Sequence, residues 1–352
     1  MSTMETGTPS AGEGRARRVT IVDVAARAGV STAAASKVLR NAYGVSPQMR
    51  EKVETAIKEL DYRPLAAARG MRGKTFTIGV LVSDIQNPYF GLLVEGVTGE
   101  VEESGYELMV GPAGASAASQ SRMIEAMIDR QMDGLILIAP VLPAAELDRV
   151  ARRLPTVVIG RHGPADDYDT VAGDDLRGAA LIVEHLVQLG HRDIAYLTHT
   201  DAHEAEPRLP QHVRELGYRQ AMEAHGLADR IDIVDGRWTA QGGQDAVRRL
   251  LERDTLPTAF FAGADVAALG VLTELWERGV DVPGRISVVG YDNAPTAGLG
   301  PVSLTSVDQS GLDMGATAAR LLLDRFERPV DARHVLTDPR LIARRTTGAP
   351  RQ

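Results

Sequence analysis

A short segment near the start of the chain sets hydroxyl and cationic side chains into an alanine- and valine-rich background. It reads VTIVDVAARAGVSTAAASKVLRN, and the polar and basic side chains of its second half include Ser31, Thr32, Ser36, Lys37 and Arg40. Hydroxyl groups and backbone amides at a helix start bind phosphate, and Lys or Arg side chains also reach the acceptor atoms of base edges. These residue types point to recognition of a polyanion.

Two short helices have to hold those side chains in place. Thr20 followed three residues later by Asp23 is a variant of the capping box that starts a helix. Gly29 offers the positive φ at which that helix can end. Ser31 is then a good N-cap for a second helix over about residues 32–40.

A third helix is expected over residues 46–60, because Ser-Pro at its start supplies an N-cap and a first-turn proline. Two helices joined by a tight glycine-containing turn and closed by a third predict a helix-turn-helix. In that motif the second helix lies in the major groove of DNA. The same spacing is also compatible with a small helical hairpin that binds nothing.

The charge of the chain is unevenly distributed. Residues 1–74 contain 13 Lys and Arg against 7 Asp and Glu, the remainder contains 26 against 40, and the net charge of the chain is −8. A basic N-terminal segment on an acidic protein indicates that this segment meets a polyanion. A solvated charged surface would give the same balance.

Composition narrows the class of protein. A length of 352 residues predicts two or three domains. The chain has no cysteine, which excludes disulfides and cysteine-based metal sites and fits a reducing compartment. No apolar run approaches the length of a membrane span, and the N-terminus lacks the apolar core of a signal peptide. We expect a cytoplasmic protein with a disordered tail over residues 1–18.

From Phe76 onward, short apolar runs alternate with helical segments. Runs such as FTIGVLVSD, DGLILIAP and ISVVGYD flank segments such as PYFGLLVEGVTGEVEESG. Buried strands that alternate with helices predict parallel sheets in an α/β fold, and such sheets bind ligands at the carboxyl ends of their strands. The polar residues that follow the runs are therefore candidate site residues: Asp84, Asn87, Arg161, Asp174, Asp265 and Asp292.

The sequence VTIVDVAARAGVSTAAASKVL, followed by VSPQMREKVETAIKELDYRP and AAARGMRG, closely resembles the lactose-repressor (LacI/GalR) transcription factors. The resemblance covers about residues 19–346. It implies an N-terminal all-α helix-turn-helix headpiece (19–63), a hinge helix or flexible basic linker (64–75) and an α/β two-lobed, periplasmic-binding-protein-like (type I) effector domain (76–346). The lobes would comprise about residues 76–173 with 309–335, and 174–308 with 336–346, before a tail over 347–352.

The resemblance also implies the partners. A homodimer is expected on pseudo-palindromic operator DNA, because one headpiece grips too little DNA. A small-molecule effector, expected to be a carbohydrate, would lie between the lobes, and its binding and DNA binding would be reciprocally coupled. Repression is the family default and activation the exception. No cofactor, metal or membrane is expected.

Carried over residue by residue, the resemblance implies DNA contacts at Thr20, Ser31, Thr32, Ala33, Ser36, Lys37 and Arg40 in the headpiece and at Ala68 and Met71 in the hinge. Met71 takes the position of an apolar wedge that kinks the operator centre. The chain departs from the family pattern on the second helix, where alanines, Lys37 and Arg40 replace the usual Thr, Val, Arg and Asn. Lys lacks the two-pronged geometry of Arg toward guanine, so the operator sequence is not deducible.

The matching motifs imply effector contacts at Asn87, Phe90, Arg161, Arg214, Trp238, Asp265 and Asp292. An aromatic face beside Asp and Arg side chains suits a hydroxylated small molecule. Ala264 stands where the family often has Asn, which leaves one expected hydrogen bond in doubt. Each charged residue has a plainer alternative on the surface or at a helix cap, and Trp238 has one in a core.

The stretch HTDAHEAEPRLPQH, residues 199–212, brings histidines and acids together. Histidines four residues apart on a helix bind metal, but the two prolines favour a loop that faces the effector. Two other protein classes share parts of the pattern. A transport solute-binding protein would need a secretion signal and no headpiece, and an enzyme would need a nucleophile, metal or phosphate-loop motif. We expect binding without turnover.

Overall fold

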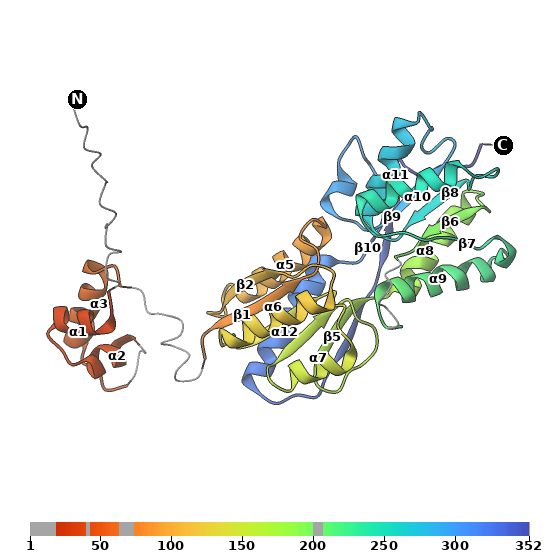
Figure 1. Ribbon diagram of the computed structural model, residues 1–352. Helices are drawn as coiled ribbons and strands as arrows, with labels where there is room; N and C mark the ends of the chain where they lie inside the picture. Colours follow the sequence, from red (N-terminus) through yellow and green to blue (C-terminus); the bar gives the residue numbers. More distant parts are fainter. Residues whose placement is uncertain (1–18, 40–42, 63–73, 200–206, 352) are drawn as a thin grey trace, which may run out of the picture. The chain divides into compact units, whose positions relative to one another are not determined.

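The computed structural model describes residues 19–39, 43–62, 74–199 and 207–351. The chain separates into two compact units, residues 1–73 and residues 74–352 (Figure 1). The expected N-terminal tail, Arg40 and the hinge positions Ala68 and Met71 lie outside the described residues.

The described part of the first unit contains the helices α1 (Ile21–Ala28), α2 (Thr32–Leu39) and α3 (Pro47–Glu59). The Thr20 amide donates to the Asp23 carboxylate with an N···O distance of 2.8 Å, and Gly29 ends α1 at φ 67°. At the start of α2, Ser31 Oγ accepts the amide of Ala34 at 3.1 Å. These caps satisfy amides that have no partner inside a helix, so local residue chemistry sets the helix boundaries.

A small core holds the three helices together. Its buried residues are Val24, Ala25, Ala35, Val38, Val53, Ala56 and Tyr62. The alanines at the contacts between helices allow the short helices to cross closely, and the valines fill the space that remains. The expected all-α helix-turn-helix is confirmed.

The second unit is built on two six-stranded sheets. The first has the order β11-β5-β4-β3-β1-β2 and is parallel throughout. The second has the order β12-β10-β9-β8-β6-β7 and is parallel except for the pair β10 and β12. The strands are β1 (Thr77–Val82), β2 (Glu107–Pro112), β3 (Gly134–Ile138), β4 (Thr156–Ile159), β5 (Asp169–Gly173), β6 (Ile194–Leu197), β7 (Asp232–Val234), β8 (Ala259–Ala262), β9 (Ser287–Asp292), β10 (Thr305–Asp308), β11 (His334–Thr337) and β12 (Arg340–Ile342).

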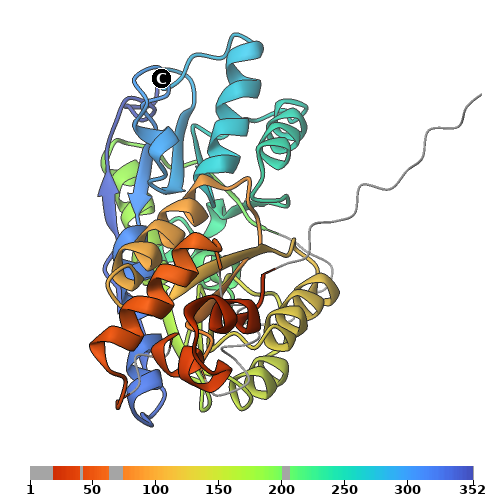
Figure 2. The ribbon, with the colours of Figure 1, turned by 90° about the vertical axis from the view of Figure 1, so that its left-hand side faces the viewer.

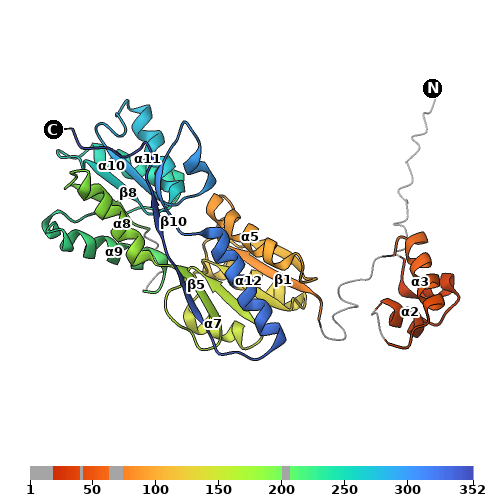
Figure 3. The ribbon, with the colours of Figure 1, turned by 180° about the vertical axis from the view of Figure 1, so that it is seen from behind.

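Helices cover both faces of each sheet, which makes two lobes (Figures 2 and 3). Lobe 1, around the first sheet, carries α5 (Pro88–Val101) and α12 (Gly311–Glu327) on one face and α6 (Ala117–Asp129) and α7 (Ala144–Ala151) on the other. Lobe 2, around the second sheet, carries α8 (Asp175–Gln188) and α9 (Pro210–Ala224) on one face and α10 (Ala240–Leu251) and α11 (Asp265–Glu277) on the other. Short 3₁₀ turns lie at Ala228–Arg230 and Pro295–Gly298. The two-lobed α/β fold is confirmed.

The chain passes between the lobes after β5, after β10 and after β11. Hydrogen bonds join the three connections, since the Asp174 amide donates to Thr337 O at 3.0 Å and Thr337 Oγ1 donates to Gln309 O at 3.1 Å. Because β11 ends at Thr337, lobe 1 extends past the expected boundary at residue 335. Three bundled connections form a hinge about which two rigid lobes can rotate.

The end of the chain is attached to lobe 2. The Gly348 amide donates to Ser287 Oγ at 3.1 Å, and the ring of His191 lies 2.8 Å from Gly348 O. His185 Nε2 and Thr347 Oγ1 are 3.0 Å apart. Residues 347 and 348 are therefore part of the lobe, although the sequence assigned them to a tail.

Candidate functional site

A cavity of about 460 Å³ lies between the two lobes of the second unit. Its wall is formed by residues at the carboxyl ends of strands in both sheets, and two hinge residues, Gly173 and Gln309, belong to it. Small-molecule sites in proteins have volumes of roughly 300–1,000 Å³. The position between the lobes is the one that parallel α/β sheets offer to a ligand.

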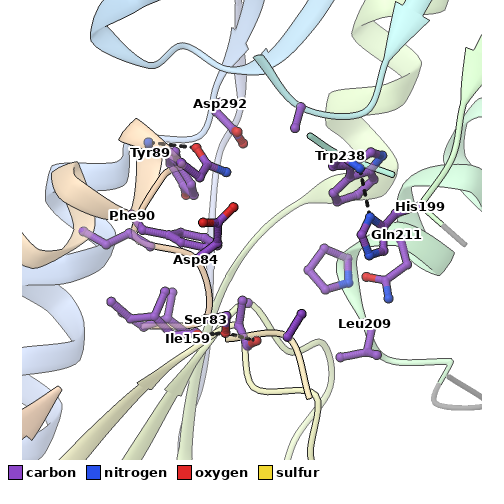
Figure 4. Close-up of a pocket in the computed structure, with 18 of the residues that line it drawn as sticks. Ser83, Asp84, Tyr89, Phe90, Ile159, His199, Leu209, Gln211, Trp238 and Asp292 are labelled. Atoms are coloured by element: carbon purple, nitrogen blue, oxygen red, sulfur yellow. Dashed lines mark hydrogen bonds between the residues drawn. The ribbon is translucent and has the colours of Figure 1, made fainter. Parts of the chain in front are cut away.

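The lobe 1 wall is mostly apolar with a polar edge. Phe90, in the first turn of α5, and Ile159, at the end of β4, face the cavity (Figure 4). The polar edge contains Asp84, which follows β1, and Asn87, whose Oδ1 accepts the Tyr89 amide at 3.0 Å. This capping bond fixes Asn87 at the mouth of the cavity.

The lobe 2 wall carries a second aromatic side chain. Trp238 Nε1 donates to Leu197 O at 3.2 Å, and the Trp238 amide donates to Nδ1 of His199 at 2.9 Å. Figure 4 shows Trp238, His199 and Gln211 on the wall opposite Phe90. Trp238 is thus a cavity residue and not a core residue. A ring-shaped ligand between the two walls would meet an aromatic face on each side.

A buried ion pair forms the back of the cavity on the lobe 2 side. Arg214 on α9 contacts Oδ1 of Asp175, the first residue of α8, through Nε at 3.0 Å and Nη2 at 2.6 Å. The other carboxylate oxygen, Oδ2, lies 2.7 Å from Nε2 of His162, which comes from lobe 1. The Asp175 and Arg214 side chains are 2% and 3% exposed, so the pair is shielded from water. A pair that is buried to this extent keeps most of its electrostatic strength.

The surroundings keep both partners of this pair charged. Burial acts to raise the pKa of the Asp175 carboxyl, but the charge of Arg214 and the hydrogen bond from His162 outweigh it, and the pKa lies below its ordinary value. Burial likewise opposes the charge of Arg214, but Asp175 outweighs it and the pKa of the guanidinium is raised.

The Arg214 guanidinium is also enclosed by rings. Its central carbon lies 3.5 Å from the ring centre of Tyr291 and 4.6 Å from that of Trp238. Its Nη1 donates to the carbonyl of Gly263. Cation–π contacts in a desolvated site add to the ion pair, so Arg214 is held rigidly against the indole of Trp238.

Two further carboxyl groups lie near the hinge. Asp292 lines the cavity at the end of β9, and its Oδ1 accepts a hydrogen bond from Gln309 Nε2 at 2.7 Å. Asp265 lies behind it and accepts hydrogen bonds from Ser306 Oγ at 2.6 Å and from the Ala294 amide at 2.7 Å. Burial and the charge of Asp265 raise the pKa of Asp292 well above its usual value, and burial raises the pKa of Asp265 to about 7.

Most of the effector residues expected from the sequence meet at this cavity, namely Asn87, Phe90, Arg214, Trp238 and Asp292. Arg161 and Asp265 lie outside the lining. Arg161 is fully buried and its Nη1 donates to Leu142 O at 2.9 Å, which turns the guanidinium into the interior of lobe 1. Asp265 is 1% exposed and points toward the hinge, where it binds Ser306. Both follow strands as expected, but burial has directed their side chains inward.

Several lining residues were not predicted from the sequence, and Asp175, Gln211 and Gln309 are among them. Gln309 directly follows β10 and Asp175 is the second residue after β5, so the rule that polar residues after strands form sites would have included them. The sequence favoured the neighbouring Asp174, which instead caps α8 by accepting the Arg177 amide at 3.0 Å. Gln211 lies on α9 after a loop, where no sequence signal marks it.

In the first unit, α2 presents an exposed face that matches the expected DNA contacts. Ser31, Thr32, Ala33 and Lys37 are exposed, and Ser36 is partly exposed. Thr20 is exposed at the start of α1, where its Oγ1 donates to Asp23. The buried side of α2 consists of Ala35 and Val38, so the polar side of the helix faces outward.

Among the described residues, no group of three or more His, Cys, Asp or Glu is arranged to hold a metal ion. His203, Asp201 and Glu204 of the histidine-rich stretch lie outside the described residues. None of the described helices combines the length and the apolar character needed to cross a membrane.

Two family descriptions match the chain. Residues 20–64 match the description "Bacterial regulatory proteins, lacI family", and residues 183–347 match "Periplasmic binding protein-like domain". The first match covers the helix-turn-helix, and the second covers most of lobe 2 and the returning segments of lobe 1.

Relatives extend the similarity over nearly the whole chain. The HTH-type transcriptional repressor PurR of Erwinia tasmaniensis is 34% identical, with 93% of this chain and 96% of that protein covered. The ribose operon repressor of Escherichia coli is also 34% identical, with 88% and 94% covered. The crystal structure of the lac repressor dimer bound to operator and the anti-inducer ONPF matches with a TM-score of 0.79 at 27% identity, covering 95% of this chain and all of that one. The exposed recognition helix, the cleft between two lobes and these full-length similarities together show that the chain belongs to the LacI family of bacterial transcriptional regulators.

Proposed function

We propose that the protein represses transcription in the cytoplasm as a homodimer on a pseudo-palindromic operator, and that a small hydroxylated effector, a carbohydrate, binds between the lobes and changes operator affinity. The relatives named above are repressors, and one of them is named for the ribose operon. The lac repressor structure contains a dimer on operator DNA. These similarities support the same arrangement here.

The observation that carries the effector role is the composition of the cavity wall. Phe90 belongs to lobe 1, Trp238 belongs to lobe 2, and Gln309 belongs to the hinge between them. A ligand that contacts all three binds better at one angle between the lobes than at another. Differential affinity of this kind shifts the population of the two lobe arrangements, and the shift is reciprocal with DNA binding.

The DNA role rests on α2. Ser31 and the amides at the start of α2 hold phosphate, while Thr32, Ala33 and Lys37 face base edges. The basic balance of residues 1–74 adds attraction that does not depend on sequence and weakens with salt. Thr20, Ser36, Arg40, Ala68 and Met71 complete the proposed DNA-contacting set.

The test combines two measurements on the full-length protein. A thermal-shift panel of sugars and nucleosides, including ribose and cellobiose, identifies ligands, because a binder raises the melting temperature. Fluorescence anisotropy with palindromic DNA from the region upstream of the gene then measures operator affinity with and without each hit. The proposal predicts specific DNA binding that at least one hit alters. Binding no tighter than to random competitor DNA, in every condition, would refute it.

The cavity is proposed to bind without turnover. Arg214 and Asp175 are paired with each other, and the relatives named above are repressors. Incubation of each binding sugar with the protein, followed by chromatography, should return the sugar unchanged. A new product that depends on the protein would contradict this part of the proposal. Light scattering at micromolar concentration tests the dimer, and a monomeric mass would count against it.

A further inference from the structure

We infer that the cavity selects neutral hydroxylated ligands over phosphorylated or carboxylated ones, and that Asp175 is the residue that sets this selectivity. The inference rests on the proposed function, because it concerns the effector bound in the same cavity. Arginine is the side chain with which proteins most readily bind phosphate and carboxylate groups. Whether the guanidinium of Arg214 is accessible to a ligand therefore determines the affinity of the cavity for anions.

The hydrogen-bonding nitrogens of Arg214 are already engaged by groups of the protein. Two of its nitrogens contact Oδ1 of Asp175, and the third donates to the carbonyl of Gly263. The Tyr291 ring covers one part of the guanidinium and the Trp238 ring another. An anionic ligand would have to displace the carboxylate of Asp175. That carboxylate also contacts lobe 1, because its Oδ2 lies 2.7 Å from Nε2 of His162. The positive charge of Arg214 is thus neutralised within the protein.

Helix N-termini also attract anions, and several helices begin at this cavity. Acidic residues of the chain lie at or just before three of those starts, whereas α9 and α10, which also begin at the cavity, have no acidic residue in their first turn. Asp175 is the first residue of α8, and Asp265 is the first residue of α11. Asp84 stands just before α5, where its Oδ1 accepts the Gln86 amide at 2.8 Å. At α8 and α5 the partial positive charge that would attract a phosphate is therefore offset by a carboxyl group of the protein.

The remaining charges of the wall point the same way. Among the described lining residues, the carboxyl groups are Asp84, Asp175 and Asp292, and the guanidinium groups are Arg214 and Arg237. Arg237 is exposed, at the water-facing side, where salt screens its charge. A phosphate deep in the cavity would therefore meet carboxyl oxygens without an uncompensated cation. A hydroxyl group would instead find both donors and acceptors.

The first experiment uses inorganic phosphate as the probe and needs no knowledge of the effector. Thermal denaturation of the full-length wild type and of Asp175→Asn is followed in phosphate and in chloride at equal ionic strength. The matched control is Asp174→Asn, which removes the adjacent carboxylate, a helix cap outside the cavity lining. It reports the effect of net charge alone.

We expect phosphate to stabilise Asp175→Asn specifically, with an apparent phosphate affinity about tenfold or more above that of the wild type, because Arg214 then carries an uncompensated charge. In the wild type and in Asp174→Asn, phosphate should raise the melting temperature only by the small general effect that it has on any folded protein. Equal phosphate responses in all three proteins would overturn the inference, as would a stronger response in the wild type.

The second experiment uses the wild type only, so it decides the matter even where Asp175→Asn does not fold. Calorimetric titrations compare ribose with ribose 5-phosphate and glucose with glucose 6-phosphate. Neither phosphate should bind more tightly than its parent sugar, and a parent that binds should lose about tenfold or more in affinity when phosphorylated. A sugar phosphate that binds as tightly as its parent, or binds where the parent does not, refutes the charge selectivity. Operator binding measured in parallel separates the two ideas, since absence of specific DNA binding refutes the proposed function and leaves the titration result standing.

Discussion

The substitution Gly263→Ala adds a single methyl group next to the cavity, and we expect it to weaken ligand binding. A Cβ built on Gly263 would overlap the indole of Trp238, with Cζ2 of the ring only 2.6 Å away. Carbon atoms in contact prefer a separation of about 3.5–4.0 Å, so in Gly263→Ala the indole must move by about 1 Å. Arg214 on one side and His199 on another limit that movement, with ring distances of 4.6 and 5.6 Å.

The cost follows from the contacts that the indole loses. Overpacking of a fitted site costs about 1–3 kcal/mol. Loss of the hydrogen bond from Trp238 Nε1 to Leu197 O, 3.2 Å long, adds about 0.5–1.5 kcal/mol. We therefore expect the free energy of unfolding of the second unit to fall by about 2–4 kcal/mol. Sugar affinity should fall at least about tenfold, equal to 1.4 kcal/mol, because the displaced ring no longer stacks on the ligand.

Urea denaturation measures the stability of Gly263→Ala, and calorimetry measures its affinity for the sugar that the thermal-shift panel identifies. The matched control is Gly99→Ala in α5, where an added Cβ meets no atom within 4 Å. That helical substitution should stabilise by about 0.5–1 kcal/mol and leave sugar affinity unchanged. Should Gly263→Ala bind sugar and resist urea like the wild type, the proposed role of the Trp238 position would be wrong.

Three further predictions test other parts of the molecule. Lys37→Ala should weaken specific operator binding by about 1–3 kcal/mol and relax the preference at one base, and unchanged discrimination at every base in a binding titration would exclude a base contact. Burial raises the pKa of Asp265 to about 7 in the folded protein, against about 4 unfolded, so the folded state binds the extra proton and its stability falls as pH rises from about 4 to about 7. Asp265→Asn should remove that pH dependence, about 1.4 kcal/mol per pH unit, from the free energy of unfolding measured with urea. If the free energies of unfolding of the wild type and the variant change in parallel with pH, the raised pKa of Asp265 is wrong. Gly315→Ala in α12 should lower the free energy of unfolding by about 1–3 kcal/mol, because the added Cβ would meet backbone atoms of α5, with Val97 N at 3.0 Å. An unchanged urea midpoint would show that α12 and α5 can move apart without cost.

Much of the architecture follows from local sequence. The Thr20–Asp23 pair, Gly29 and Ser31 act through backbone groups within a few residues, so they mark the helix boundaries of the headpiece without any tertiary contact. Alternating apolar runs and helical segments likewise predict two parallel sheets, because a strand buried on both faces is continuously apolar. The rule that ligands bind at the carboxyl ends of strands placed Asn87 and Asp292 correctly at the cavity.

The resemblance to known regulators contributed what local rules do not supply. Phe90, Arg214 and Trp238 lie on helices or in loops, and the matching motifs led to them. The structure places all three in the wall of one cavity. Their roles toward a ligand stay predictions, as do the DNA contacts assigned to the headpiece.

Only the tertiary structure decides which polar side chains face the cavity and which are already paired. Asp175 and Arg214 are 39 residues apart in sequence, and they pair because α8 and α9 lie side by side on the same face of the lobe 2 sheet. Arg161 follows a strand just as Asn87 does, but the interior of lobe 1 takes up its guanidinium. Helix caps and strand patterns depend on near neighbours along the chain, whereas burial and charge pairing depend on which distant segments meet. The sequence by itself therefore determined the kind of protein and the location of its cleft, and the packing of distant segments decided the charge that a ligand meets there.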